Sequence, residues 1–220
     1  MKRLLALGVV FLPWPIKRWV LRRFWGYRIA DGARIGLSYI FPGELVMGEG
    51  AYIGHLNVAI HLGRLECGAH SVIDRSNWIT GHPPGGAHFT HRKERDPALV
   101  VGEHAAITKS HIIDCTARIE IGAFSTIAGY HSQFITHGIN VTDNRQDCKP
   151  ISIGAYCLVG TRVTVLGGAS LPDRSVLGAG SVLNKAHAGG CAVYAGQPAA
   201  RVKELDPDAA YFHRSRGFVD

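Results

Sequence analysis

Residues 153–183 read IGAYCL-VGTRVT-VLGGAS-LPDRSV-LGAGSV-L, and this stretch decides the fold. A large aliphatic residue recurs at every sixth position, and the residue four places after each of the first five is small or β-branched. The aliphatic positions are Ile153, Val159, Val165, Leu171, Leu177 and Leu183. Neither the helical period of about 3.6 residues nor the strand period of about two accounts for this spacing. The stretch is therefore an internal six-residue repeat.

The same period fills most of the preceding chain. It runs through residues 101–119, shifts by two positions at Ile121 and continues to Ile127. It also covers residues 47–65, and Ile29 and Ile35 fit a first turn. Its positions in these stretches are Met47, Ile53, Ala59, Leu65, Val101, Ile107, Ile113 and Ile119.

A period of six indicates short strands that each place one aliphatic side chain in the core. The small residue four positions later also points inward, near a corner, and a Gly after the aliphatic residue permits close backbone approach. Three such strands close one triangular coil of about 18 residues, and stacked coils pair their strands in parallel. The repeat therefore predicts an all-β parallel β-helix over residues 29–200.

Two polar stretches interrupt the repeat. Residues 81–98 read GHPPGGAHFTHRKERDPA, and residues 138–150 read GINVTDNRQDCKP. Long excursions from a rigid scaffold often carry function. Residues 201–220 lack the repeat, and we expect them to form a short C-terminal helix or tail.

The composition agrees with a β-rich globular protein. Glycine makes up 27 of 220 residues and hydrophobic residues 46%, which disfavours a mostly helical chain and excludes a disordered one. The five cysteines include no C-x-x-C pair, so neither a disulfide framework nor a structural zinc site is expected. Residues 1–28 hold seven basic residues and no acidic one, and the rest of the chain is balanced. A terminal basic patch argues against a nucleic-acid binder.

Three segments resemble motifs of the hexapeptide-repeat acyltransferases. Residues 135–138, ITHG, resemble the segment with the family's catalytic histidine, and residues 150–154, PISIG, resemble its restart of the repeat. Residues 195–202, AGQPAARV, resemble its closing motif. The resemblance covers most of residues 29–203 and implies that the β-helix is left-handed. The N-terminal segment and the first excursion look like O-acetyltransferases of exopolysaccharide or O-antigen biosynthesis.

The resemblance implies an acyl-CoA-dependent O-acyltransferase, with acetyl-CoA as donor and a saccharide hydroxyl as acceptor. His137 would be the general base, because a neutral imidazole suits proton removal from a hydroxyl at pH 7. The acyl group would pass directly to the acceptor without an acyl-enzyme, and no metal is expected.

Four other residues are candidates for contact with the acceptor. His131 precedes His137 by six residues and His111 lies further back, while Asp143 and Asn144 are near in sequence and could orient the base. His82, His88 and His91 lie on the first excursion and could touch the acceptor, although a solvated loop is the simpler interpretation.

In the resembling family, acyl-CoA lies in a groove between subunits of a homotrimer. Matching the motifs one by one places the donor at six positions, of which Leu158 and Asn184 depart from the residues usual in the family. Lys185 and Arg201 would meet the CoA phosphates. The six positions are Leu158, Thr161, Ala179, Asn184, Lys185 and Arg201.

Residues 1–28 combine basic, apolar and tryptophan residues. The uncharged run at 4–16 is shorter than the roughly 20 residues that span a bilayer and is interrupted by Pro13 and Pro15. The following segment has apolar residues at helical spacing, namely Ile16, Trp19, Val20 and Phe24. Two interpretations remain open: an amphipathic helix lying on an anionic membrane, or a helix packed on the body.

These expectations describe a cytoplasmic enzyme held peripherally on the inner face of the plasma membrane, where a lipid-carrier-linked sugar could be its acceptor. Two alternatives remain. A non-catalytic β-helical scaffold would bind no acetyl-CoA. A γ-type carbonic anhydrase needs three zinc-binding histidines at a spacing that His131 and His137, six residues apart, do not have.

Overall fold

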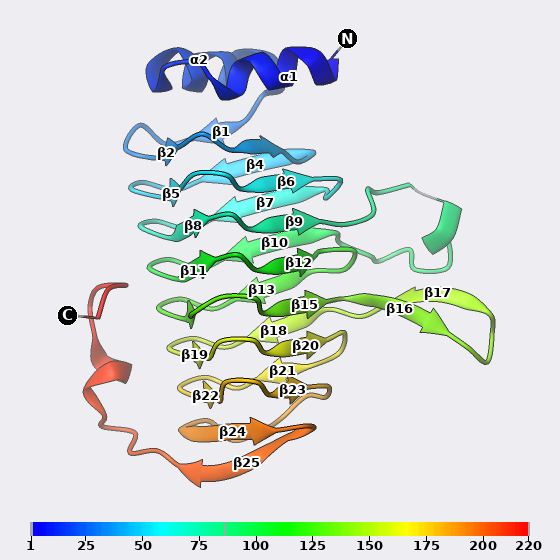
Figure 1. Cartoon of the computed structure of the whole chain (residues 1–220), viewed down its shortest axis with the longest axis vertical. Coiled ribbons are helices and arrows are strands. Elements are labelled where there is room, and N and C mark those ends of the chain that lie inside the picture. Colours follow the sequence, from blue (N-terminus) through cyan, green and yellow to red (C-terminus); the bar gives the residue numbers. More distant parts are fainter. Residues whose placement is uncertain (1, 86, 220) are drawn as a thin grey trace.

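The computed structural model describes residues 2–85 and 87–219, with the side chains of all these residues except 2–4 and 87. The chain winds into a left-handed parallel β-helix with a helical layer at its N-terminal end and a lobe on one side (Figure 1). The predicted fold class is confirmed. Met1, at the start of the predicted N-terminal segment, lies outside the described residues.

Three parallel sheets form the sides of the β-helix. Sheet A contains β1 (Arg28–Ile29), β4 (Glu44–Met47), β7 (Arg64–Cys67), β10 (Ala98–Val101), β13 (Ile119–Ile121), β18 (Ile151–Ile153) and β21 (Ser170–Leu171). Sheet B contains β2 (Arg34–Ile35), β5 (Tyr52–Ile53), β8 (Val72–Arg75), β11 (Ala106–Lys109), β14 (Thr126–Ile127), β19 (Leu158–Val159), β22 (Val176–Leu177), β24 (Ala192–Gly196) and β25 (Ala199–Glu204). Sheet C contains β3 (Tyr39–Phe41), β6 (Val58–Ile60), β9 (Trp78–Thr80), β12 (Ile112–Asp114), β15 (Gln133–Ile135), β20 (Thr164–Leu166) and β23 (Val182–Leu183).

The six-residue ladder forms the core of the β-helix. Every aliphatic position from Ile153 to Leu183 is at most 1% exposed. The register stacks these positions on one another, pairing Ile121 with Ile153 and Ile153 with Leu171. The coils approach so closely that a Cβ on Gly122 would lie 2.5 Å from the backbone nitrogen of Ala155. Glycine after the aliphatic residue is therefore a steric requirement at this corner.

Both interruptions of the repeat leave the β-helix after a strand of sheet C. The first contains the short 3-10 helix η1 (Ala87–Phe89), and the second is an antiparallel hairpin of β16 (His137–Asn140) and β17 (Arg145–Cys148). They project from the same side of the β-helix (Figure 1). We call this pair of excursions, residues 81–98 and 137–150, the lobe.

The N-terminal segment forms two helices, α1 (Lys2–Val10) and α2 (Trp14–Trp25), laid across the first coil (Figure 1). Leu21 packs into the core at 1% exposure, whereas Trp19 and Phe24 are 60% and 67% exposed. The apolar face predicted from helical spacing therefore points mainly away from the body. No helix in the described part of the chain combines the length and apolarity needed to cross a bilayer.

Lys17, although basic, does not face water. Its side chain is buried, and Nζ donates hydrogen bonds to the carbonyl oxygens of Gly36 at 2.7 Å and Val10 at 3.4 Å. Burial lowers the pKa of Lys17 to about 8. Arg18 and Arg22 pair with Asp31 at 3.5 and 2.8 Å, so three of the basic residues attach the helical layer to the first coil.

The C-terminal segment differs from the expected boundary at residue 200. Strand β25 continues to Glu204 and pairs antiparallel with β24. The short 3-10 helix η2 (Ala210–His213) follows, and the tail then turns back along the β-helix (Figure 1). The guanidinium of Arg214 lies over the Tyr211 ring at 3.9 Å, and the Tyr156 hydroxyl donates to the Arg214 carbonyl at 3.5 Å. The tail is thus fixed to the coils.

Candidate active site

His137 lies where the chain leaves sheet C for the hairpin of the lobe. Its Nδ1 is 2.5 Å from Oδ2 of Asp114, which ends the neighbouring strand β12. The backbone N–H of His137 donates to the same carboxylate oxygen at 3.2 Å. The His137 side chain is 37% exposed and that of Asp114 only 8%. A buried carboxylate therefore holds an imidazole whose other edge is accessible.

Asp114 is surrounded by hydrogen-bond donors. The hydroxyl of Thr116 donates to Oδ1 at 2.7 Å, and that of Thr136 lies 3.3 Å from Oδ2. Burial favours the protonated acid, but the hydrogen bonds from His137 and Thr116 and the charge of His137 outweigh it, so the pKa of Asp114 is lowered from its ordinary value. The carboxylate is thus ionised at neutral pH. It accepts the Nδ1–H of His137, which leaves Nε2 as the free acceptor.

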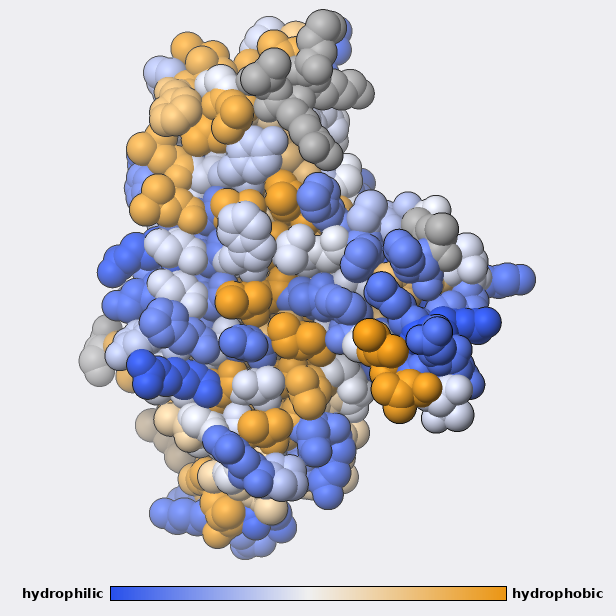
Figure 2. Space-filling model, turned by 45° about the vertical axis from the view of Figure 1, so that its right-hand side comes forward, coloured by the Kyte–Doolittle hydropathy of each residue, from blue (hydrophilic) through white to orange (hydrophobic). Residues whose placement is uncertain are grey.

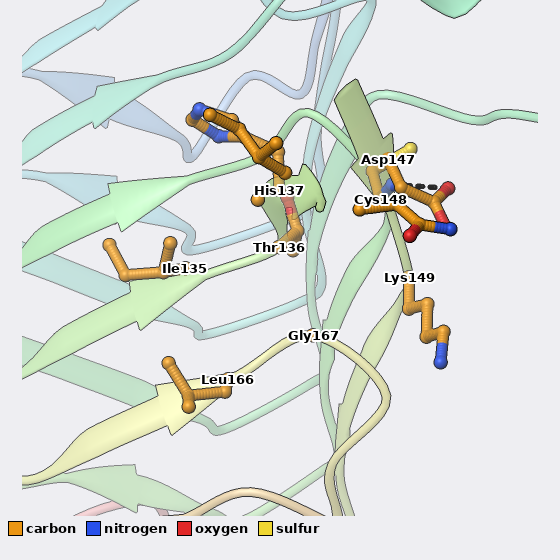
Figure 3. A pocket seen from close by; sticks show the side chains of 11 residues that line it. Ile135, Thr136, His137, Asp147, Cys148, Lys149, Leu166 and Gly167 are labelled. Carbon is orange, nitrogen blue, oxygen red and sulfur yellow. Dashed lines mark hydrogen bonds between the residues drawn. The ribbon is translucent and has the colours of Figure 1, made fainter. Parts of the chain in front are cut away.

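A hollow of about 450 Å³ opens beside His137. Figure 3 shows Ile135 and Leu166 one above the other on neighbouring strands, with His137 at the strand end and Lys149 beyond the hairpin. The remaining lining is mainly backbone and the hairpin itself. The hollow therefore offers an apolar wall from sheet C next to the imidazole of His137.

The lobe has its own small core and an ion pair. Phe89, Ala117 and Cys148 are buried together, and Arg92 makes two hydrogen bonds of 2.6 Å to the carboxylate of Asp147. Because Arg92 comes from the first excursion and Asp147 from the second, the pair joins the two. The first excursion is therefore a structural part of the site rather than a separate solvated loop.

Two histidines named as acceptor-binding candidates lie away from His137. His111 is 1% exposed: its Nδ1 accepts the N–H of Ser132 at 3.1 Å, and its Nε2 lies 3.1 Å from the Thr108 hydroxyl. Both nitrogens are thus used inside the β-helix, and burial lowers the pKa of His111 to about 4. We therefore withdraw His111 as an acceptor contact. His131 lies exposed at the corner between β14 and β15, at the opposite end of β15 from His137.

Asp143 and Asn144 lie at the exposed tip of the hairpin. The side-chain amide of Asn140 donates to Asp143 at 2.7 Å, so Asp143 stabilises the turn. The partner of the His137 imidazole is Asp114 and not these residues, which corrects the expectation from sequence proximity.

The six expected donor-binding residues are divided among the two ends of the sheet C strands and sheet B. Asn184 and Lys185 follow β23 and thus share the strand-end edge of His137, two strands away in the order β15-β20-β23. Thr161 and Ala179 precede β20 and β23, at the other end. Leu158 is on β19 and Arg201 on β25, both in sheet B, where Arg201 pairs with Glu204 at 3.2 Å. One chain does not gather all six around His137.

Among the described residues, no three His, Cys, Asp or Glu side chains are arranged to hold a metal ion.

Sequence reasoning missed Asp114 because it precedes His137 by 23 residues. The available signal was the coil register: writing SHIID above HSQFI aligns Asp114 with Ile135, two residues from His137.

Comparisons with known proteins identify the repeat. A sequence profile described as the hexapeptide repeat of succinyl-transferase matches residues 150–185. No sequence among the curated proteins matches the chain.

Solved structures share the architecture. A hexapeptide-repeat-containing acetyltransferase from Vibrio cholerae has a TM-score of 0.52 and 23% identity over 64% of this chain and 74% of its own. The polysialic acid O-acetyltransferase OatWY has a TM-score of 0.51 and 18% identity over 81% of this chain and 84% of its own. Residues 150–185 are therefore a hexapeptide repeat, and the chain has the left-handed β-helix fold of hexapeptide-repeat acetyltransferases.

Proposed function

We propose that the protein is an acetyl-CoA-dependent O-acetyltransferase that acts on a saccharide hydroxyl. The observation that carries the proposal is the pair of Asp114 and His137, joined at 2.5 Å beside a hollow on a hexapeptide-repeat β-helix. Fold alone does not establish an activity, whereas a buried carboxylate that orients an accessible imidazole is an arrangement made for general base catalysis.

The proposed reaction moves one proton through His137. Nε2 accepts the proton of the acceptor hydroxyl as its oxygen attacks the thioester carbonyl carbon. The C–S bond of the tetrahedral intermediate then breaks, and Nε2–H returns the proton to the CoA thiolate. Asp114 stays ionised and stabilises the transient imidazolium. The acetyl group passes directly to oxygen, so no acyl-enzyme forms.

The donor would lie along sheet C, where the apolar side chains of Ile135 and Leu166 border the hollow. Lys185 is exposed on the same strand-end edge and is available for a CoA phosphate. Thr161 and Ala179, at the opposite strand ends, would complete the donor site of a neighbouring subunit, which explains why one chain does not gather all six residues.

We propose that the protein is a homotrimer in which neighbouring subunits share the donor-binding residues. Sheet C carries exposed apolar side chains on its outer face, with Trp78 at 50%, Ile112 at 45% and Leu166 at 37% exposure. Figure 2 shows apolar side chains in a column beside the lobe. On sheet A the corresponding outward residues of β13 and β18 are Glu120 and Ser152. An apolar face next to His137 fits a subunit contact that would complete the donor groove.

The helical layer is the proposed site of membrane contact. Apolar side chains gather over it at one end of the molecule (Figure 2), and exposed Trp19 and Phe24 would enter the headgroup region. A trimer would present three such layers, which would strengthen peripheral binding to the inner face of the plasma membrane. A lipid-carrier-linked sugar is an acceptor that such a location would make available.

The test supplies the purified protein with radiolabelled acetyl-CoA and a set of glycans, because OatWY, of the same fold, is a polysialic acid O-acetyltransferase. The set contains neutral methyl hexopyranosides and an oligomer of sialic acid. We expect label to be transferred to at least one glycan in an alkali-labile ester. Acetyl-CoA binding without transfer would contradict the enzyme, and absence of acetyl-CoA binding would favour a non-catalytic scaffold.

A further inference from the structure

A second imidazole, that of His82, lies next to His137. The two ring centroids are 5.6 Å apart and the ring planes meet at 82°, so the rings stand edge to face. His82 follows β9 of sheet C, whose next strand along the β-helix ends at Asp114. Two imidazoles from different coils are therefore in contact, and one of them, that of His137, lines the hollow.

The first excursion fixes His82 in place. Arg95 donates to the carbonyl oxygens of His82 at 2.7 Å, Pro83 at 2.8 Å and Thr116 at 2.8 Å. Its guanidinium also lies 4.8 Å from the centroid of the buried Phe89 ring, which itself contacts His82 at 5.4 Å. Arg95 thus holds the backbone of His82, and the ring of Phe89 packs against its imidazole.

The ring of His82 is not used in holding the fold. Among the residues that the structure describes, neither of its ring nitrogens has a hydrogen-bond partner, in contrast to both nitrogens of His111. The residue is partly exposed. A rigidly held and unpaired imidazole beside a general base is placed for contact with a substrate.

Charges around His82 favour its neutral form. Burial lowers its pKa from the ordinary value, and the neighbouring His137, His88 and Arg95 lower it further, while Asp114 opposes them. A neutral imidazole carries one N–H donor and one nitrogen acceptor. It can therefore both donate to and accept from hydroxyl groups at neutral pH.

We propose that His82 binds the acceptor hydroxyl next to the one that attacks, so that the enzyme selects a saccharide with two hydroxyls on adjacent carbons. His137 takes the proton of one hydroxyl, and His82 hydrogen-bonds to its neighbour. Rings 5.6 Å apart can each reach one of two adjacent oxygens at a hydrogen-bond distance of about 2.7–3.2 Å. This inference rests on the proposed O-acetyl transfer and names the class of acceptor.

The experiment compares acceptors and variants in one cycle. The acceptor is whichever methyl hexopyranoside of a glucoside, galactoside and mannoside set is acetylated, together with its deoxy analogue that lacks the adjacent hydroxyl. The variant is His82→Phe, which keeps a flat ring against His137 and Phe89 but removes both nitrogens. His82→Gln restores one donor and one acceptor, and His88→Phe changes a nearby exposed imidazole of the lobe as a control.

The expected result is a loss of selectivity. Wild type and His88→Phe should favour the diol over the deoxy analogue by about 10²-fold in kcat/KM, the factor for leaving one polar partner unpaired. For His82→Phe the ratio should fall to near one, because its kcat/KM drops for the diol alone. His82→Gln should recover part of the ratio.

Three outcomes overturn the inference in different ways. If His82→Phe slows both acceptors by the same factor at an unchanged melting temperature, then His82 acts through His137 and does not bind the acceptor. If wild type acetylates no member of the hexopyranoside set, the diol assignment fails for simple sugars. Failure of label transfer to every glycan, including the sialic acid oligomer, overturns the proposed function as well.

Discussion

At the scale of the residue, Asp114 determines which nitrogen of His137 can act. Its carboxylate accepts the Nδ1–H, so Nε2 is left unprotonated; in the proposed reaction Nε2 would face the acceptor, and the negative charge would favour the imidazolium that forms during attack. The threonine hydroxyl and backbone N–H around Asp114 keep its own charge in place. The chemistry thus depends on a residue that would never touch the substrate.

Replacing Asp114 by Asn should therefore reduce activity without removing the base. In Asp114→Asn the amide no longer supplies a charge and can present its NH₂ to Nδ1, which favours the wrong tautomer. We expect kcat/KM to fall by about 10²-fold or more, with the KM for acetyl-CoA little changed. Steady-state kinetics measures this, and an unchanged kcat/KM would show that Asp114 has only a structural part.

His111 gives a pH dependence of stability that is separate from catalysis. Its pKa is lowered to about 4 in the folded protein, against an ordinary value of 6.5, because burial disfavours the charged imidazolium and the nearby His131 opposes a second positive charge. The unfolded chain binds the extra proton between these values. The stability contributed by neutral His111 is therefore complete above pH 6.5 and is lost as the pH falls toward 4.

Urea unfolding between pH 7 and pH 4 tests this prediction. The wild type should lose up to about 3 kcal/mol more than His111→Asn over this window. The control His61→Asn changes an exposed histidine that does not contribute to the pKa shift of His111 and should follow the wild type. Parallel curves for wild type and His111→Asn would contradict the assignment.

At the scale of the element, the six-residue ladder was enough to predict the β-helix. The aliphatic residue of each coil occupies the same inward position, so a buried residue such as Ile153 stacks on the equivalent residue of the next coil. Strand β25 escaped prediction because it pairs antiparallel at the last edge and carries no ladder. Helix α2 was predicted, but which of its sides packs on the β-helix was not. The ammonium of Lys17 is buried because it donates to a backbone carbonyl oxygen that only the folded coil places there.

The site was predictable only where a local motif marks it. His137 lies within a recognisable four-residue segment. Asp114, by contrast, comes close to His137 through the register of the coils, and His82 does so through an excursion that Arg95 holds in place. Contacts across coils have no fixed sequence spacing once excursions of variable length intervene. This also explains why Asp143, close in sequence, was wrongly considered as a partner of His137.

The exposed face of α2 leads to a prediction about membrane binding. Trp19→Ser together with Phe24→Ser removes two side chains that are 60% and 67% exposed, so the fold should be retained. Because apolar insertion strengthens interfacial binding, the double variant should lose most of its sedimentation with vesicles of phosphatidylcholine and phosphatidylglycerol. Val141→Ser, at the exposed tip of the hairpin, is the matched control. Equal sedimentation of all three proteins would contradict membrane contact through α2.

At the scale of the whole molecule, the apolar outer face of sheet C predicts the assembly. Ile112→Arg places a charge at the centre of this face and should convert a trimer to monomers, as measured by light scattering after gel filtration. Acetyl-CoA affinity should fall together with the trimer, because the donor groove would need two chains. Ser152→Arg on sheet A is the control and should remain trimeric. A trimer in Ile112→Arg would place the subunit contact elsewhere.

The molecule thus combines a β-helix, a helical layer at one end and, at one side, a lobe that begins at the proposed base. The central claim is that His137 moves the proton in direct acetyl transfer, and release of free CoA thiol measures it most directly. We predict that release by the wild type requires the acceptor and falls by about 10²–10⁴-fold in His137→Ala, while acetyl-CoA still binds. Equal acceptor-dependent release by wild type and His137→Ala would contradict the account.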